Sequence, residues 1–151
     1  MSDSFDYLDV SGFTAGTVGP AGERVFYLQA RTLDGVVSLK LEKGQVQALA
    51  TAIDQLLERV EAPDTSTRPP ALVEPVEPAW AIRALGVGWD VERERLVIVA
   101  QELVDDEDED AEPAEGRFHL TPEQARGFVD HAVFLVEYGR DFGRQNGHKP
   151  R

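Results

Sequence analysis

Two stretches of the chain follow the same plan, a strand of alternating character that runs directly into an amphipathic helix. They are residues 36–60, VVSLKLEKGQVQALATAIDQLLERV, and residues 116–139, GRFHLTPEQARGFVDHAVFLVEYG. When Leu41 is aligned with Leu120, the two helices align without a gap. Their apolar pairs are Val46 and Ala125, Leu49 and Phe128, Ala50 and Val129, Ile53 and Ala132, Leu56 and Leu135, and Leu57 and Val136. Six pairs in register predict an internal duplication.

Short strands joined by turn signals precede each helix. Apolar alternation predicts strands at residues 5–10, 13–19, 24–31 and 36–41, then a helix at 43–60. In the second half, strands are expected at residues 82–88, 95–99 and 116–120. The turn at 19–22 contains Gly19, Pro20 and Gly22, which favour a tight hairpin. In the proposed duplication, Arg95–Val99 aligns with Arg24–Leu28, and the offset between the halves changes only at turns.

These elements predict an α+β protein. Each half is expected to be an antiparallel meander followed by one helix, and the halves are expected to share one core with pseudo-two-fold symmetry. The predicted divisions are residues 1–61 for the first repeat, 62–79 for a proline-rich crossover linker, 80–139 for the second repeat with an acidic loop at 102–115, and 140–151 for a polar basic tail. This order of elements resembles the PUR nucleic-acid-binding fold, although a fold does not fix a function.

One helix boundary is specified by its local sequence. Thr121 is a favourable N-cap, Pro122 suits the first helical position, and Gln124 completes a capping box. Gly139 is expected to weaken or end this helix. The remaining residues would then form the tail.

Composition limits the location and the partners. The net charge is −13, with −3 in residues 1–60 (eight acidic, five basic) and −10 in residues 61–151 (twenty acidic, ten basic). Such a surface repels nucleic-acid phosphates, which disfavours nucleic acid as a partner. The chain has no cysteine. With no basic leader and no apolar run long enough to cross a bilayer, it is predicted to be cytoplasmic, with no membrane contact.

A candidate binding face lies in the less acidic half. Alternation along residues 24–31 sends Phe26, Leu28 and Ala30 toward the core and the intervening residues to the opposite face. The candidate binding residues are Arg24, Tyr27, Gln29, Arg31 and Lys40. Aromatic and cationic side chains of this kind stack bases or bind a partner's carboxylates. An ordinary solvated sheet shows the same pattern to water.

No other stretch predicts a specific chemistry. The acidic run at residues 105–110 lacks the glycine and the spacing of a calcium loop, so it is interpreted as solvated. His119, His131 and His148 share no metal spacing and no catalytic motif, and structural roles are expected for them. Residues 19–24 join two strands, which favours a hairpin turn over a phosphate loop. We therefore expect no metal and no cofactor, and we expect enzymatic activity only if a site is assembled from scattered residues.

Several runs resemble a known family. GERVFYLQAR at residues 22–31, VSLKLEKGQVQAL at 37–49 and RQNGH at 144–148 are similar to an uncharacterised actinobacterial family of conserved proteins of unknown function. The resemblance covers nearly the full length. It implies gene neighbours that are a phosphoglycerate-mutase-like phosphatase and a kinase-like protein. Members usually carry a cysteine-rich, zinc-ribbon-like C-terminus that this chain lacks, so no zinc site is expected.

Two functional hypotheses follow. The first is a non-enzymatic binding or adaptor module that acts with a protein partner, such as the phosphatase-like or kinase-like neighbour. The alternative is single-stranded nucleic-acid binding through the face around Arg24 to Lys40. The sequence does not predict the oligomeric state.

Overall fold

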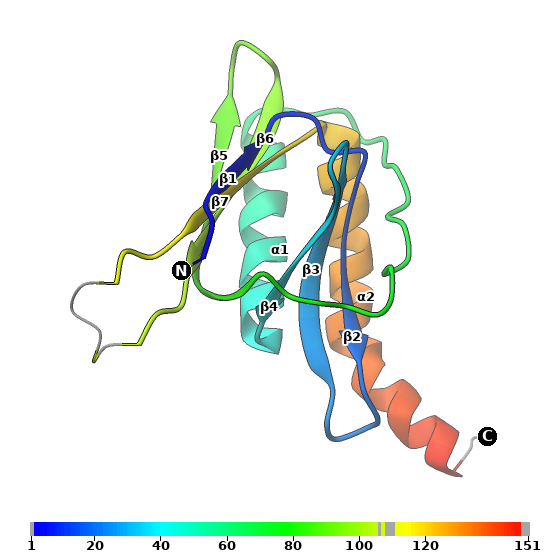
Figure 1. The fold of residues 1–151 in the computed structure, drawn as a ribbon. Helices are drawn as coiled ribbons and strands as arrows, with labels where there is room; N and C mark the ends of the chain where they lie inside the picture. The colour runs from blue at the N-terminus through cyan, green and yellow to red at the C-terminus, as the bar shows by residue number, and fades with distance from the viewer. Residues whose placement is uncertain (1, 106, 108–110, 149–151) are drawn as a thin grey trace.

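A computed structural model describes residues 2–105, 107 and 111–148, and for residues 138–148 only the backbone is considered. The elements in chain order are β1 (Phe5–Tyr7), β2 (Gly12–Val18), β3 (Val25–Thr32), β4 (Gly35–Leu41), α1 (Lys43–Arg59), β5 (Trp80–Asp90), β6 (Arg95–Glu102), β7 (Glu115–Leu120) and α2 (Pro122–His148). The predicted α+β class is confirmed: one mixed sheet is covered on one face by two helices (Figure 1).

In the described part of the chain, the sheet has seven strands in the order β1-β7-β6-β5-β4-β3-β2. Two antiparallel meanders, β2-β3-β4 and β5-β6-β7, meet where β4 and β5 run parallel for only two residue pairs. We call β2, β3, β4 and α1 the first half, and β5, β6, β7 and α2 the second half. The predicted strand at residues 5–10 is shorter than expected, because the chain leaves β7 after Tyr7 and pairs with β3 from Gly12 onward.

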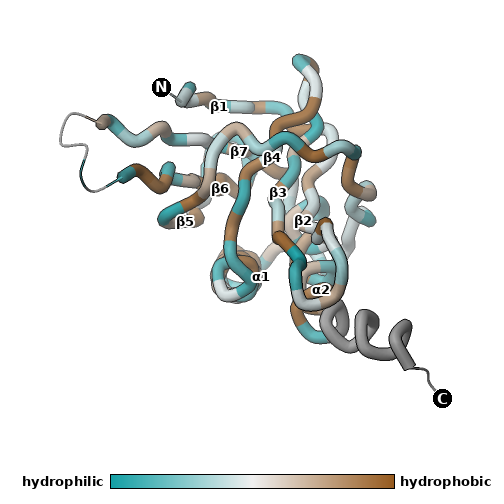
Figure 2. The backbone as a smooth tube through the Cα atoms, turned by 60° about the horizontal axis from the view of Figure 1, so that its bottom comes forward, coloured by the Kyte–Doolittle hydropathy of each residue, from teal (hydrophilic) through white to brown (hydrophobic). Residues whose placement is uncertain are grey.

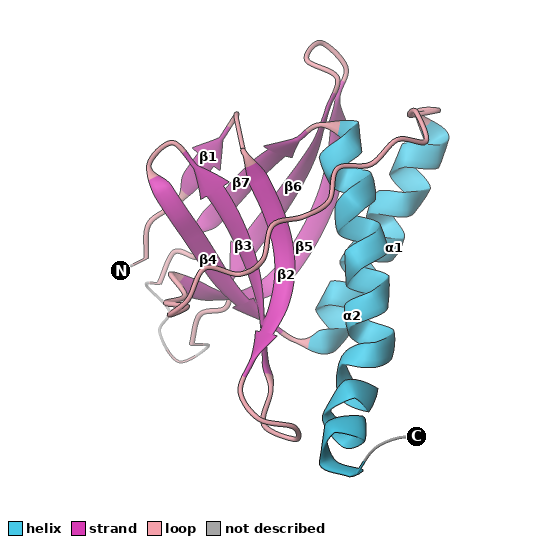
Figure 3. Ribbon diagram, turned by 90° about the vertical axis from the view of Figure 1, so that its right-hand side faces the viewer, coloured by secondary structure: helices cyan, strands magenta, loops and turns pink. Residues whose placement is uncertain are grey.

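Both helices lie on the inner side of the curved sheet (Figure 3). They run side by side beneath the arc of strands (Figure 2). Helix α1 packs mainly on β5, and α2 packs mainly on β2, so each helix covers a strand of the other half. The core therefore joins the two halves into one packed unit.

The predicted helical stripes face this core. The buried residues of α1 are Val46, Leu49, Ala50, Ile53, Leu56 and Leu57, the same six that the periodicity predicts. In α2, Ala125, Phe128, Val129 and Ala132 are buried, and Leu135 and Val136 pack partly buried against them. The ring centroid of Phe13 lies 5.3 Å from that of Phe118 and 5.0 Å from that of Phe128. Burial of such side chains contributes roughly 1.5–3 kcal/mol each.

The N-termini of both helices carry the same polar device. The Gln124 side-chain oxygen accepts the Thr121 N–H at 2.9 Å, and the Thr121 hydroxyl accepts the Gln124 N–H at 3.1 Å, which confirms the predicted capping box. At α1, Gln45 accepts the Glu42 N–H at 2.7 Å. Each glutamine also donates to the first-strand region of the other half: Gln124 to the Val10 carbonyl at 2.6 Å, and Gln45 to the Ile82 carbonyl at 3.1 Å.

Two sequence predictions need correction. Helix α2 runs through Gly139 to His148, so the helix does not end there and the tail from residue 140 starts as helix. An interior glycine costs only about 1 kcal/mol relative to alanine, and the charged residues after it are compatible with a helix. Residues 149–151 lie outside the described chain.

The second correction concerns the phase of β6. Leu28 pairs with Leu39, and the buried counterpart of that pair in the second half is Ile98 with Phe118. The predicted alignment matches Ile98 with Tyr27, which lies on the opposite face. The alignment is therefore displaced by one residue, and a one-residue slip exchanges the two faces of a strand.

Candidate functional site

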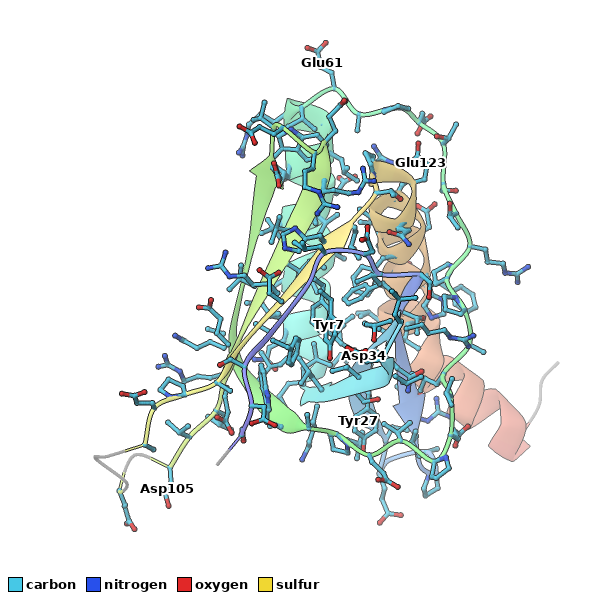
Figure 4. All side chains as sticks on the ribbon, turned by 45° about the horizontal axis from the view of Figure 1, so that its top comes forward. Tyr7, Tyr27, Asp34, Glu61, Asp105 and Glu123 are labelled. Carbon is cyan, nitrogen blue, oxygen red and sulfur yellow. The ribbon has the colours of Figure 1, made fainter. Side chains whose placement is uncertain are left out.

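The proline-rich segment from Glu61 to Ala79 crosses the outer face of the first half, and we call it the strap (Figure 1). It begins after α1, where Glu61 has a φ of +53°. The Thr67 N–H donates to the Glu123 carbonyl at the start of α2, at 2.9 Å, and the Ala79 N–H donates to the Ser38 carbonyl of β4 at 2.8 Å. Figure 4 labels Glu61 at the start of the strap and Glu123 in the first turn of α2.

Gln29 fixes the middle of the strap. Its side-chain oxygen accepts the Val73 N–H at 2.7 Å, and its side-chain nitrogen donates to the Val73 carbonyl at 3.1 Å and to the Ser38 hydroxyl at 3.1 Å. The Gln29 side chain is consequently buried, with 2% exposure, although it lies on the outer face. Because Gln29 binds the backbone N–H and the carbonyl of Val73, it holds the strap in an extended conformation independently of the side chain at that position.

Close steric contacts complete this arrangement. A Cβ placed on Gly12 would lie 2.8 Å from Pro70, and one on Gly16 would lie 2.6 Å from Leu72. On α2, a Cβ on Gly127 would lie 1.8 Å from the Thr67 carbonyl oxygen. These glycines allow the strap to approach the sheet and the helix.

The predicted site residues are divided between two roles. Gln29 and Arg31 hold the strap, with Nη2 of Arg31 donating to the Ala71 carbonyl at 2.9 Å. Tyr27 and Lys40 are opposite each other on β3 and β4. Arg24 lies apart from these residues, beside the β2–β3 hairpin, where it lines a hollow of about 200 Å³.

The predicted alternation and the predicted hairpin are both confirmed. Leu28 and Ala30 are buried against the helices, and Gln29 lies on the other face. Between β2 and β3, the Glu23 N–H donates to the Pro20 carbonyl at 2.9 Å. Gly19 and Gly22 have φ values of +111° and +86°, as a tight turn requires.

A second feature lies where the strap passes the edge of the sheet. A hollow of about 470 Å³ follows β2, with the strap on one side and α2 on the other, and we call it the edge cleft. Nε2 of His131 donates to the Ala15 carbonyl at 2.8 Å, and both residues line this cleft. The lining residues are Thr14, Ala15, Gly16, Thr17, Arg68, Pro69, Pro70, Ala71, Leu72, Glu74, His131 and Leu135.

Sequence reasoning did not find this cleft. His131 takes the place that Ala52 holds in α1, and a polar residue at a small apolar position was the available signal. Arg68 and Glu74 carried no signal, because their position depends on where the strap docks.

The remaining candidates of the sequence have local roles. Nε2 of His119 lies 2.6 Å from a carboxylate oxygen of Asp6 and joins β7 to β1. Within the described part of the chain, no three acidic or histidine side chains gather as a metal site would require. The acidic run at 105–110 lies largely outside the described residues, as does the side chain of His148.

A family model described as a protein of unknown function, DUF3090, matches residues 5–145. The chain belongs to this family. The match includes both halves and the whole strap, so these features are not additions to a shorter DUF3090 unit. Neither the curated proteins nor the solved structures include a match to the chain. Among the described residues, neither helix has both the length and the apolar character that crossing a membrane requires.

Proposed function

We propose that the protein is a non-enzymatic binding module and that a partner protein places an extended segment in the edge cleft. The observation that carries this proposal is the open hollow along β2, between the strap and α2. Its volume of about 470 Å³ is in the range of roughly 300–1,000 Å³ typical of ligand sites.

The position of β2 favours this type of partner. Among the described residues, β2 pairs with β3 alone and forms one edge of the sheet. Edge strands offer backbone donors and acceptors to added extended chain. His131 already occupies the Ala15 carbonyl, and it would mark one end of the bound segment.

The lining of the cleft supports a peptide over a simple anion. Arg68 and Glu74 provide opposite charges on the strap, while Leu72 and Leu135 provide apolar contact. Opposite charges at separate points orient a partner more than they strengthen its binding. The protein already binds one extended segment through its backbone, because Gln29 holds the N–H and the carbonyl of Val73 in the strap.

The sequence supports a proposal for the partner and the location. The family resemblance implies an actinobacterial origin and a phosphatase-like or kinase-like neighbour as the partner, and the absence of cysteine favours a reducing compartment such as the cytoplasm. A net charge of −13 would accelerate association with a partner whose contacting surface is basic.

Differential capture from a native extract tests the proposal. The bait proteins are the wild type, Glu74→Lys and Arg68→Glu, with Glu77→Lys as the matched control, since Glu77 is an exposed strap residue outside the cleft. We expect a partner to be retained by the wild type and the control and to be lost from both cleft variants. No stable partner, or equal capture by all four proteins, would contradict the proposal.

We also infer that the two halves descend from a duplicated unit. Support comes from the paired registers of Leu28 with Leu39 and Ile98 with Phe118, and from the matching glutamines at the two helix N-termini. The pseudo-two-fold relation and the PUR-like order remain part of this inference. Single-stranded nucleic-acid binding stays a prediction that rests on Arg24, Tyr27 and Lys40, because Gln29 and Arg31 hold the strap.

A further inference from the structure

The outer face of β5 and β6 has a trough beside a ridge. Gly88 pairs with Val97, and Gly86 pairs with Val99. These residues point outward, because the intervening residues of β6, including Ile98, are buried against the core. A Cβ placed on Gly86 or Gly88 would meet no atom within 4 Å. The glycines of β5 therefore form an open trough next to the two valines of β6.

A charged pair continues the same pattern at the hairpin end. Asp90 on β5 pairs with Arg95 on β6 in the next outward-facing row. The two side chains do not bond to each other. Oδ1 of Asp90 accepts the Arg93 N–H at 3.1 Å, and Nη1 of Arg95 donates to the Arg93 and Glu94 carbonyls at 3.0 and 3.3 Å. Within the described residues, the second Asp90 oxygen and Nη2 of Arg95 are left for a partner.

We propose that this face binds the same face of a second copy. A two-fold axis parallel to the strands and midway between β5 and β6 places β6 of one copy over β5 of the other. In an isologous interface of this kind, each contact occurs twice. The valines of each copy then fill the glycine trough of the other, in the same rows that pair them within one sheet.

Charge complementarity selects a second copy over other occupants. The same rotation places Arg95 of each copy over Asp90 of the other, so two ion pairs form at symmetric positions. A molecule that binds this face must present two apolar side chains and one cation, spaced as alternate residues of a strand, with an anion beside the cation. β6 and β5 of this chain carry that set in register.

Charge exchange tests the dimer directly. Sedimentation equilibrium of the full chain should give a dimer for the wild type. Asp90→Arg opposes two arginines and Arg95→Asp opposes two aspartates, so each variant alone should be monomeric, with dimer affinity reduced at least tenfold. Mixing the two variants should restore a heterodimer, and the double variant Asp90→Arg, Arg95→Asp should restore the homodimer.

Asp34→Arg is the matched control for Asp90→Arg, because Asp34 lies exposed in the β3–β4 turn and its replacement changes the net charge by the same amount as Asp90→Arg. It should dimerise like the wild type. Thermal unfolding monitored by circular dichroism verifies that each variant is folded. A monomeric wild type, charge variants that remain dimeric, or a mixture of the two variants that fails to associate would each overturn the proposal. None of these results depends on the edge cleft, so the two proposals fail separately.

Discussion

The outer faces of the two halves have the same strand arrangement, but the strap covers only the first of them. In the first half, the strap fills the space over Gly12 and Gly16, and Gln29 is buried beneath it. In the second half, a Cβ on Gly86 or Gly88 would meet no atom within 4 Å. Strand glycines therefore have two roles in this protein. In the first half they allow the strap to pack close to the sheet, and in the second half they leave part of the outer surface uncovered.

This difference indicates how one architecture can support separate interactions. The strap closes one face and forms the edge cleft with α2, whereas the other face keeps a trough and ridge exposed to solvent. Equal substitutions on the two faces should therefore have unequal effects.

The largest effect is expected at the contact between the strap and α2. Gly127→Ala should lower the free energy of unfolding by about 3 kcal/mol, because its methyl group would overlap the Thr67 carbonyl, which is backbone and cannot rotate away. Urea unfolding measures the change. Gly44→Ala is the control, since Gly44 is helical with open space around it, and it should raise stability by up to about 1 kcal/mol. Equal changes in stability for the two variants would contradict the close contact between the strap and α2 at Gly127.

The same substitution on the two faces should differ in sign. Gly16→Val should destabilise the protein by about 2 kcal/mol, because the added atoms overlap Leu72. A Cβ on Gly88 would meet no atom within 4 Å, and a valine there lies opposite Val97, so Gly88→Val should stabilise the strand by about 0.5 kcal/mol. Chemical denaturation in dilute solution, where any dimer dissociates, measures both. A loss of similar size at both positions would refute the contrast between the faces.

Removing the middle anchor should have a smaller effect. Gln29→Ala should cost about 1.5 kcal/mol, because the Val73 N–H and carbonyl lose their partner. Limited proteolysis should then cut the strap faster. Gln47→Ala, at an exposed position of α1, should change stability by less than about 0.5 kcal/mol. An uncut strap in the Gln29 variant would argue against the anchor.

The smallest effect should be equal in the two halves. Gln45→Ala and Gln124→Ala should each cost about 1 kcal/mol, because each removes an N-terminal capping interaction and a contact to the other half. Thermal unfolding compares them. A large loss at one position and none at the other would count against the duplicated origin.

The helices and most strands could be predicted because their signals are local. The apolar period of α1 predicts the same six residues that are buried, and the Thr121 cap is specified by four consecutive residues. The phase of β6 could not be predicted, because residues 96–100 are all apolar and show no alternation, although only Leu96, Ile98 and Ala100 are buried. The predicted helix end at Gly139 was wrong, because the helical residues on either side stabilise the helix by more than one interior glycine destabilises it.

The site was the less predictable part. Alternation places Gln29 on the outer face, but its burial depends on Val73, which lies 44 residues further along the chain. Proline content indicates a stiff segment and does not indicate the surface that it covers. His131 and the edge cleft depend on the same docking, so they were not visible before the structure.

Hydrogen exchange at the Val73 amide tests the central claim most directly, namely that the strap is held on the outer face of the first half. The amides of Val73 and Thr67 should be protected in the wild type, because they donate to Gln29 and to the Glu123 carbonyl. In Gln29→Ala, Val73 should lose its protection while Thr67 keeps it. Exchange of the wild-type Val73 amide at the rate of an unstructured peptide would contradict the account.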